Sequence, residues 1–398
     1  IRVHATDLDG TGQHLTDGRL IHADNAGELF NKGFAALHGR APAVRWMEAA
    51  WRKEALPQWE GQWQDRSHLH YCWGGDGKAK GDRLYGVPDA AALEFASEHG
   101  NIPQINFPAN ASDEWALGLF ELIASYKGTV PEVWLALGNE SWLTSWPATK
   151  WLENRAKAEW PNHWQSYRFK DKLGFSYACK RLVQLYELAQ QVETPGAPQF
   201  RWIWETQGSQ YDATQIAFEN SLWHVAEPND PRLALWPGII DRVQGNGYFG
   251  SPKHMRKYFG GGDPNDHDAL YAACLKSINS RINTLAGNAA TAAEYGCAFD
   301  IYEGGDSLIG FQYKGFRDTP QMASLYQHLF SECERIGVDV FFHFADCFPG
   351  GKYGWGAVRD WSQPLNSTAK GAVIEKWLSG SAVPAPVPVP APPVNEPD

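Results

Sequence analysis

The sequence lacks several features that would place it in other classes of protein. It contains no run of about 18 apolar residues, so no membrane-spanning helix is predicted. Lysine and arginine number 35 against 46 aspartates and glutamates, and the formal charge of −11 argues against nucleic acid or an anionic membrane as a partner. No internal repeat stands out. A length of 398 residues allows two domains, but α/β barrels of this size are commonly a single domain.

The six cysteines show no CxxC spacing, which argues against a zinc or redox site. Three of them, Cys179, Cys274 and Cys333, fall within helical patterns, where cysteine behaves as a small hydrophobic residue. Mostly free thiols are expected, and a loop disulfide between Cys72 and Cys347 is left open as an alternative.

Two acidic loops, 7–10 and 263–268, resemble metal sites at first sight. Neither matches the spacing of a calcium-binding loop, so both are interpreted as solvated turns. No metal and no cofactor are therefore expected.

Residues 381–398 alternate proline with small residues such as alanine and valine. This composition predicts an extended polyproline spacer without a core of its own. Such a spacer typically ties a secreted catalytic domain to a carbohydrate-binding or anchoring module. The sequence also begins at Ile1 rather than Met, as expected after processing. One globular domain over 1–380, a linker over 381–398 and secretion to the periplasm or the cell exterior are predicted.

Short apolar runs alternate with helical patterns through residues 1–380. This alternation predicts a parallel sheet with crossover helices, and eight such units predict a closed (β/α)8 barrel of the TIM type. Helices are expected over 89–99, from 113, and over 166–192, 268–286 and 319–336. The strands are expected at 43–47, 102–107, 133–137, 200–204, 242–247, 298–302 and 338–344, with one more near 19–22.

Two glutamates stand where the fourth and seventh expected strands end. Glu140 follows Asn139 after one apolar run, and Glu303 precedes two glycines after another. Active sites of such barrels lie at the carboxyl ends of the strands. Cleavage of a glycosidic bond needs one carboxylic acid as proton donor and one carboxylate as nucleophile or base. Either motif alone is compatible with an ordinary turn, but the two together at this spacing favour a hydrolytic pair.

With these motifs the sequence resembles clan A, the retaining glycoside hydrolases with β/α barrels. Asn-Glu at the end of the fourth strand and a second Glu at the end of the seventh are that clan's pattern. The resemblance implies Glu140 as acid/base and Glu303 as nucleophile. The segments 44–48, 63–66 and 102–108 look like parts of secreted bacterial members of poorly defined specificity.

The resemblance extends to residues that would bind substrate or support the acids. Asn139 is expected to hold a sugar 2-hydroxyl, a contact that strengthens in the transition state. Arg45 resembles the arginine that keeps the nucleophile ionised, with a surface salt bridge as the alternative. Tyr248 occupies the place of an aromatic residue beside the nucleophile, unless it is an ordinary packed tyrosine. The strand ends at Asn106, Glu205 and His343 are expected to line the −1 subsite.

The chain departs from the clan at the eighth strand, where a tryptophan platform is usual. Residues 341–344 read Phe-Phe-His-Phe instead, and Trp355 in the next loop is the candidate replacement. The chain has 19 tryptophans, enough both to pack a core and to stack on sugars. Trp142 and Trp146 lie in a loop-like stretch and are further candidates for sugar contacts.

The sequence thus predicts a secreted, cellulase-like endo-β-glycanase that hydrolyses a cell-wall β-glucan or a related polysaccharide with retention. An exo-glycosidase or transglycosylase on the same barrel is one alternative. A carbohydrate-binding protein without hydrolytic activity is the other, since a fold alone does not determine function.

Overall fold

The computed structural model describes residues 28–47, 62–63, 66, 87–210, 212–348 and 351–380. The expected strand at 19–22, the acidic loop 7–10 and the proline-rich segment 381–398 lie outside these residues. The division into a domain over 1–380 and a linker therefore stays a prediction. Within the described part of the chain, no helix is both long and apolar enough to cross a membrane.

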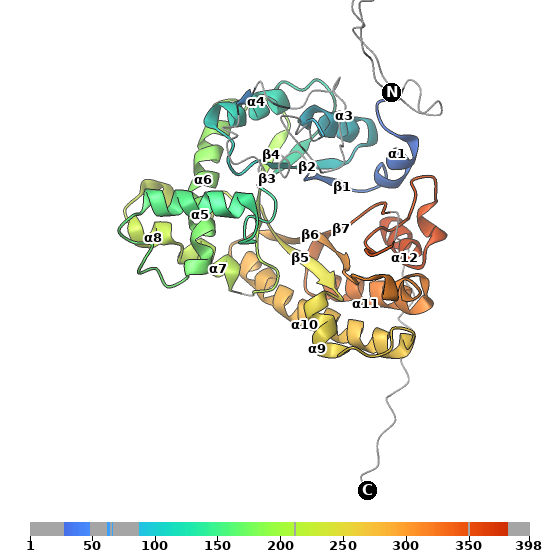
Figure 1. Cartoon of the computed structure of the whole chain (residues 1–398). Helices are drawn as coiled ribbons and strands as arrows, with labels where there is room; N and C mark the ends of the chain where they lie inside the picture. Colours follow the sequence, from blue (N-terminus) through green and yellow to red (C-terminus); the bar gives the residue numbers. More distant parts are fainter. Residues whose placement is uncertain are drawn as a thin grey trace, which may run out of the picture.

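The seven strands of the described residues form one parallel sheet in chain order (Figure 1). Each strand pairs with the next one along the chain, and helices connect them. This confirms the α/β barrel class predicted from the alternating pattern. The strands are β1 (Ala43–Trp46), β2 (Ile102–Phe107), β3 (Glu132–Leu137), β4 (Gln199–Glu205), β5 (Arg242–Phe249), β6 (Ala298–Asp306) and β7 (Val338–His343).

The sheet curls so far that its two ends meet. β1 and β7 are the end strands of the described sheet, yet they are in contact. Ala43 of β1, Trp134 of β3 and Val340 of β7 share one interior apolar cluster. The described strands therefore form a nearly closed barrel, and the position of the eighth expected strand, 19–22, lies outside the described residues.

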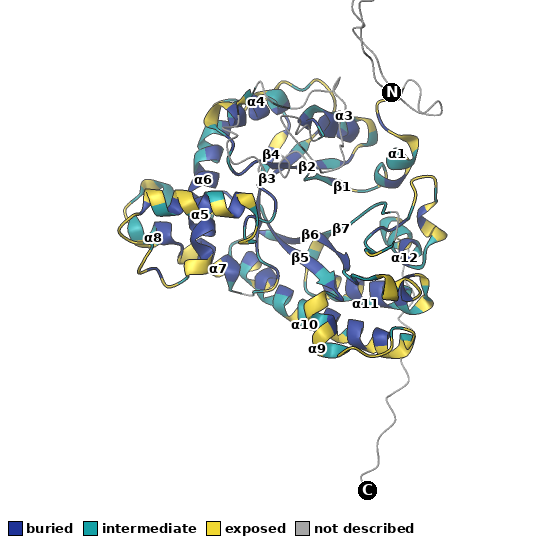
Figure 2. Cartoon of the chain, viewed as in Figure 1, coloured by how far each residue is buried: buried dark blue, intermediate teal, exposed yellow. Residues whose placement is uncertain are grey.

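Helices surround the sheet, with their buried sides toward the strands and exposed sides outward (Figure 2). Ser112 accepts a hydrogen bond from the Trp115 N–H at 3.1 Å and so caps the helix predicted to begin at residue 113. The helices are α1 (Lys32–His38), α3 (Asp89–His99), α4 (Asp113–Ala124), α5 (Pro147–Glu159), α6 (Leu173–Ala189), α7 (Ala213–Glu219), α8 (Leu222–Ala226), α9 (Pro252–Tyr258), α10 (His267–Glu294), α11 (Pro320–Arg335) and α12 (Ala369–Leu378).

Two predicted helices have different bounds in the structure. The helix expected over 166–192 begins only at Leu173, because residues before it form turns and a separate 3-10 segment. The helix expected over 268–286 continues to Glu294. The 3-10 segments are η3 (Lys170–Lys172), η4 (Pro231–Ala234), η5 (Phe311–Tyr313), η6 (Phe316–Asp318) and η7 (Leu365–Ser367).

The barrel interior carries a buried polar network. Gln104 and Gln244 exchange hydrogen bonds of 2.8 and 2.9 Å. Asp300, with 0% of its surface exposed, accepts two bonds from Arg242 at 2.6 and 2.7 Å. It also accepts from Gln244 at 3.2 Å and from the Val340 N–H at 3.1 Å. Since a buried carboxylate is tolerated only when paired, this network ties β5, β6 and β7 together.

Replacing Asp300 tests this account. Asp300→Ala should lower the free energy of unfolding by about 3–5 kcal/mol, because it leaves the Arg242 charge without its buried partner. Asp339→Ala is the matched control, since Asp339 pairs with the same Arg242 but is 61% exposed. It should cost less than about 1 kcal/mol. Equal losses in urea denaturation of the two variants would contradict the assignment.

Candidate active site

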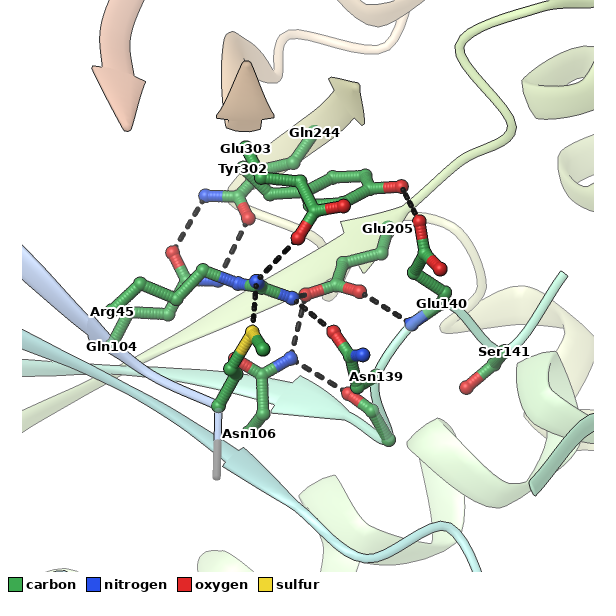
Figure 3. A network of polar contacts seen from close by, with 12 residues as sticks. Arg45, Gln104, Asn106, Asn139, Glu140, Ser141, Glu205, Gln244, Tyr302 and Glu303 are labelled. Atoms are coloured by element: carbon green, nitrogen blue, oxygen red, sulfur yellow. Dashed lines mark hydrogen bonds and ion pairs between the residues drawn. The ribbon is translucent and has the colours of Figure 1, made fainter. Parts of the chain in front are cut away.

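Polar side chains from five strand ends meet at the carboxyl edge of the barrel (Figure 3). Because parallel strands all end at the same edge, residues far apart in sequence come together there. The group consists of Arg45 from β1, Asn106 from β2, Asn139 and Glu140 just after β3, Glu205 from β4 and Glu303 from β6.

Arg45 lies at the centre of this group. Its Nη2 donates to Asn139 Oδ1 at 2.7 Å and to Glu205 Oε1 at 2.8 Å. Its Nη1 lies 3.4 Å from Glu303 Oε2, so the tighter ion pair is with Glu205. The guanidinium also lies over the Tyr302 ring, 4.9 Å from its centroid. With a side chain only 6% exposed, Arg45 supplies one buried positive charge between two carboxylates.

Glu205 is fully occupied by partners within the protein. Its Oε1 accepts from Arg45 and from Asn106 Nδ2, the latter at 2.6 Å. Its Oε2 accepts from the backbone N–H of Glu140 at 3.2 Å. Asn106 also donates to the Gly138 carbonyl at 2.7 Å. Glu205 and Asn106 thus hold the turn that carries Glu140.

Glu140 has a strained backbone. Its φ of 50° is the one positive value of a non-glycine residue in the described chain, and Gly138 has a φ of 73°. A left-handed glutamate costs on the order of 1 kcal/mol and persists only where its surroundings hold it. The Glu205 bond to its N–H and the bond from Ser141 Oγ to the Leu137 carbonyl, at 2.8 Å, hold this turn.

Glu140 and Glu303 lie close enough for each to shift the pKa of the other. Burial raises the pKa of Glu140, and the negative charge of Glu303 raises it further. Burial also raises the pKa of Glu303, but Arg45, Glu140 and Tyr248 oppose that rise. The pair therefore favours a state in which Glu140 carries a proton and Glu303 is ionised.

Tyr302 belongs to the site but was not predicted from the sequence. Its hydroxyl donates to Glu140 Oε1 at 3.3 Å and accepts from Trp142 Nε1 at 3.1 Å and from Asn246 Nδ2 at 3.3 Å. Burial keeps the pKa of Tyr302 well above its usual value, so the hydroxyl retains its proton.

A register irregularity explains why Tyr302 was missed. Neighbouring residues of a regular strand point to opposite faces, so Tyr302 and Glu303 would not share a site. The pairing of β6 with β7 shifts between Ile301 and Gly304, and its pairing with β5 shifts beside Asn246. At Gly304 a Cβ would lie 2.6 Å from the Phe341 ring, so this irregular segment requires glycine.

The other expected site residues fall into two groups. Tyr248 lies near enough to Glu303 to favour its ionised form, and the Trp142 indole N–H donates to the Tyr302 hydroxyl. His343 instead contacts the Tyr326 hydroxyl at 2.9 Å. Burial and the nearby Lys370 lower its pKa to about 3, so His343 is neutral at physiological pH.

The other two expected tryptophans lie in different surroundings. Trp146 is the residue before α5 and is half-buried. Trp355 stacks on Tyr353, with ring centroids 4.5 Å apart, and packs against Phe344 at 5.3 Å. Phe344 in turn meets the Tyr248 ring at 6.1 Å.

The cysteines contribute no chemistry to this site. The cysteines within the described ranges are free thiols. Four of them are buried and Cys347 is partly exposed; the buried ones are Cys179, Cys274, Cys297 and Cys333. Cys72, the other member of the disulfide left open, lies outside the described residues. No cluster of three or more metal-ligating side chains occurs in the part of the chain that the structure covers. In the loop 263–268, Asp263 Oδ1 accepts from the Asn265 backbone at 2.9 Å, as in a turn.

The fold and this edge define an α/β barrel with a buried pair of glutamates. No family model matches the sequence, and no curated protein sequence matches it significantly. One similar solved structure is the GH51 arabinofuranosidase from Xanthomonas axonopodis pv. citri, with a TM-score of 0.47 and 13% sequence identity. The match covers 78% of this chain and 58% of the arabinofuranosidase, so the chain spans little more than half of that protein's length.

The raised pKa of Glu140 predicts a pH-dependent stability. Between the ordinary glutamate pKa of about 4.3 and the higher folded value, the folded protein binds the proton that the unfolded chain releases. Stability therefore falls as pH rises through this interval, by up to about 1.4 kcal/mol per pH unit. Glu140→Gln has no proton to lose, so its stability relative to the parent should increase from pH 5 to pH 8.

Urea denaturation at several pH values measures this difference. Glu121→Gln serves as the control, because Glu121 is an exposed glutamate on α4. A Glu140→Gln difference that stays constant with pH would mean that Glu140 is ionised in the folded protein.

Proposed function

We propose that the protein is a retaining glycoside hydrolase in which Glu303 is the nucleophile and Glu140 is the acid/base. The observation that carries the proposal is the buried pair itself, in which one carboxyl holds the proton and the other lies beside a guanidinium. Inverting enzymes separate their two carboxyls by roughly 6.5–9.5 Å to admit a water molecule, whereas retaining enzymes keep them closer. Two buried carboxyls that shift the pKa of each other support the closer, retaining arrangement.

In the first step Glu303 attacks the anomeric carbon while Glu140 protonates the leaving oxygen. Arg45 and Tyr248 favour the ionised form of Glu303 that this attack needs. The Tyr302 hydroxyl occupies Oε1 of Glu140, which leaves Oε2 to carry the transferable proton. Arg45 donates to the side-chain oxygen Oδ1 of Asn139, so the side-chain NH2 group of Asn139 is oriented to donate to a sugar hydroxyl.

In the second step Glu140 acts as a base toward water. Once Glu303 has formed its ester bond, the negative charge that raises the pKa of Glu140 is gone. Glu140 then takes a proton from water as the water attacks the anomeric carbon and releases Glu303. One group thus serves as acid and then as base, because its neighbour changes charge during the reaction.

For the substrate we propose a β-linked polysaccharide, cut internally by a secreted enzyme. The support is chemical. The Tyr302 hydroxyl bonds both the Trp142 indole N–H and Glu140 Oε1, so Trp142 lies near the proposed acid/base. The flat indole ring of a tryptophan suits the CH face of a sugar. A screen over purified β-glucan, xylan and mannan tests this by the sizes of the products. Internal cuts give a ladder of oligosaccharides, whereas an exo-acting enzyme releases one small product. Binding without any cleavage would favour a carbohydrate-binding protein.

Two variants test the assigned roles. Glu303→Ala should abolish turnover, and azide should restore it by forming a glycosyl azide of the opposite anomeric configuration at the open site. Glu140→Ala should lower turnover of the polysaccharide by about 10²–10⁴-fold. It should largely spare the first step with an activated aryl glycoside, since a good leaving group needs little protonation.

Equal losses for both variants on the activated glycoside, without azide rescue, would reject the assignment. Glu121→Ala on the exposed face of α4 is the control and should retain parental activity.

A further inference from the structure

A polar cavity lies on the β6–β7 side of the barrel, and none of its lining residues belongs to the group around the glutamate pair. It has an accessible volume of about 90 Å³ and is bounded by η6, the loop 351–359 and the start of α12. A cavity needs roughly 10–15 Å³ to admit one water molecule. This one therefore has room for a small polyatomic group together with water.

The cavity is rich in positive charge although the chain as a whole is acidic. Four cationic side chains line it: Lys314, Arg317, Arg359 and Lys370. The carboxylates that face them are Asp318, which pairs with Arg359, and Asp306, which lies 2.5 Å from Lys370. Lys314 and Arg317 have no carboxylate partner among the described residues, so two positive charges are unmatched.

Arg317 is the most unusual member of this cluster. It is only 4% exposed, and its terminal nitrogens donate to backbone carbonyls, including those of Leu308 at 2.5 Å and Gly351 at 2.7 Å. Its Nε is buried without a hydrogen-bond partner in the described chain. A buried guanidinium without a carboxylate is costly, and a bound anion would remove that cost. Burial lowers the pKa of Arg317, the negative charge of Asp306 opposes that change, and the positive charge of Arg359 adds to it.

The surroundings of the cavity also suit an anion. The positive end of the α12 dipole faces it, because Thr368 and Lys370 line the cavity at the start of that helix. Tyr353 adds an aromatic wall, and its ring is the end of the row formed with Trp355, Phe344 and Tyr248. Since Tyr248 lies near enough to Glu303 to influence its pKa, the row runs from the cavity toward the glutamate pair.

We propose that this cavity binds an oxyanion, which is either the carboxylate or sulfate group of a sugar or a free inorganic anion. Arg317 and Lys370 form its fixed wall, while Lys314 and Arg359 stand at the more exposed side. If the anion belongs to a sugar, the cavity extends the proposed active site, and that part rests on the proposed function. The anion site itself does not.

Calorimetric titration of the full chain tests the site. Sodium sulfate and sodium glucuronate are the probes, glucose is the neutral comparison, and sodium chloride keeps the ionic strength constant. The parent should bind at least one of the two anions saturably and should not bind glucose in this way. The double variant Lys314→Gln/Arg359→Gln should weaken that binding by about tenfold or more, because it removes two charge-assisted contacts.

The matched control is Lys276→Gln/Lys376→Gln, which removes the same charge from exposed positions that do not line the cavity. It should bind as the parent does. Arg359 and its partner Asp318 are 40% and 47% exposed, so the lining variant should stay folded, and thermal unfolding checks this.

Each result decides the proposal. Binding of both anions supports a site that accepts a sugar-borne group, and binding of sulfate alone supports a site for a free anion. Failure of the parent to bind either anion beyond the chloride background overturns the proposal, as does equal binding by the parent and the lining variant. Because the titration needs no turnover, its outcome is independent of whether the glutamate pair hydrolyses glycosides.

Discussion

The buried guanidinium of Arg45 is the contact on which the rest of the site depends. It ties β1 to Asn139 after β3, to Glu205 on β4 and to Glu303 on β6. Removing one partner of a buried ion pair typically costs 3–5 kcal/mol, because the other charge is left uncompensated. The same cost applies to Glu205 and Glu303, whose charges would be left without a partner if Arg45 were removed. Arg45 therefore holds the strand ends together and at the same time favours the ionised form of Glu303.

The other features of the site follow from the position of Glu140 beside the carboxylate of Glu303. Glu205 accepts the N–H of Glu140 and supports the left-handed turn that aims Glu140 toward Glu303. The charge of Glu303 and burial raise the pKa of Glu140, so the pair favours a state in which Glu140 keeps its proton. Tyr302 then fixes which oxygen of Glu140 is free to carry it. Glu140 thus combines a strained backbone, burial and a neighbouring negative charge, a combination that is common at functional sites.

Most of the strand ends at this edge were predictable from the sequence, and the reasons are physical. Glu140, Glu205 and Glu303 each follow an apolar run, and parallel strands necessarily end together. Tyr302 was not predictable, because the irregular pairing of β6 breaks the two-residue alternation on which such inference depends.

The charged cavity and the contacts of His343 could not be predicted from the sequence. The cavity is built from three segments that meet only in the folded chain, η6, the loop 351–359 and the start of α12. His343 does lie at the end of a strand, as expected, but it contacts the Tyr326 hydroxyl, and the nearby charges of Lys370 and Asp306 influence its pKa. Strand ends can be read from local patterns, whereas loop contacts depend on the whole fold.

The most direct test of the account is the anomeric configuration of the first product. Proton NMR during cleavage of a β-linked oligosaccharide resolves the two anomers before they equilibrate. The proposed nucleophile and acid/base pair predicts that the β-anomer appears first, with the α-anomer following only by mutarotation. Initial appearance of the α-anomer would mean that water attacks the sugar directly, and it would contradict Glu303 as the nucleophile.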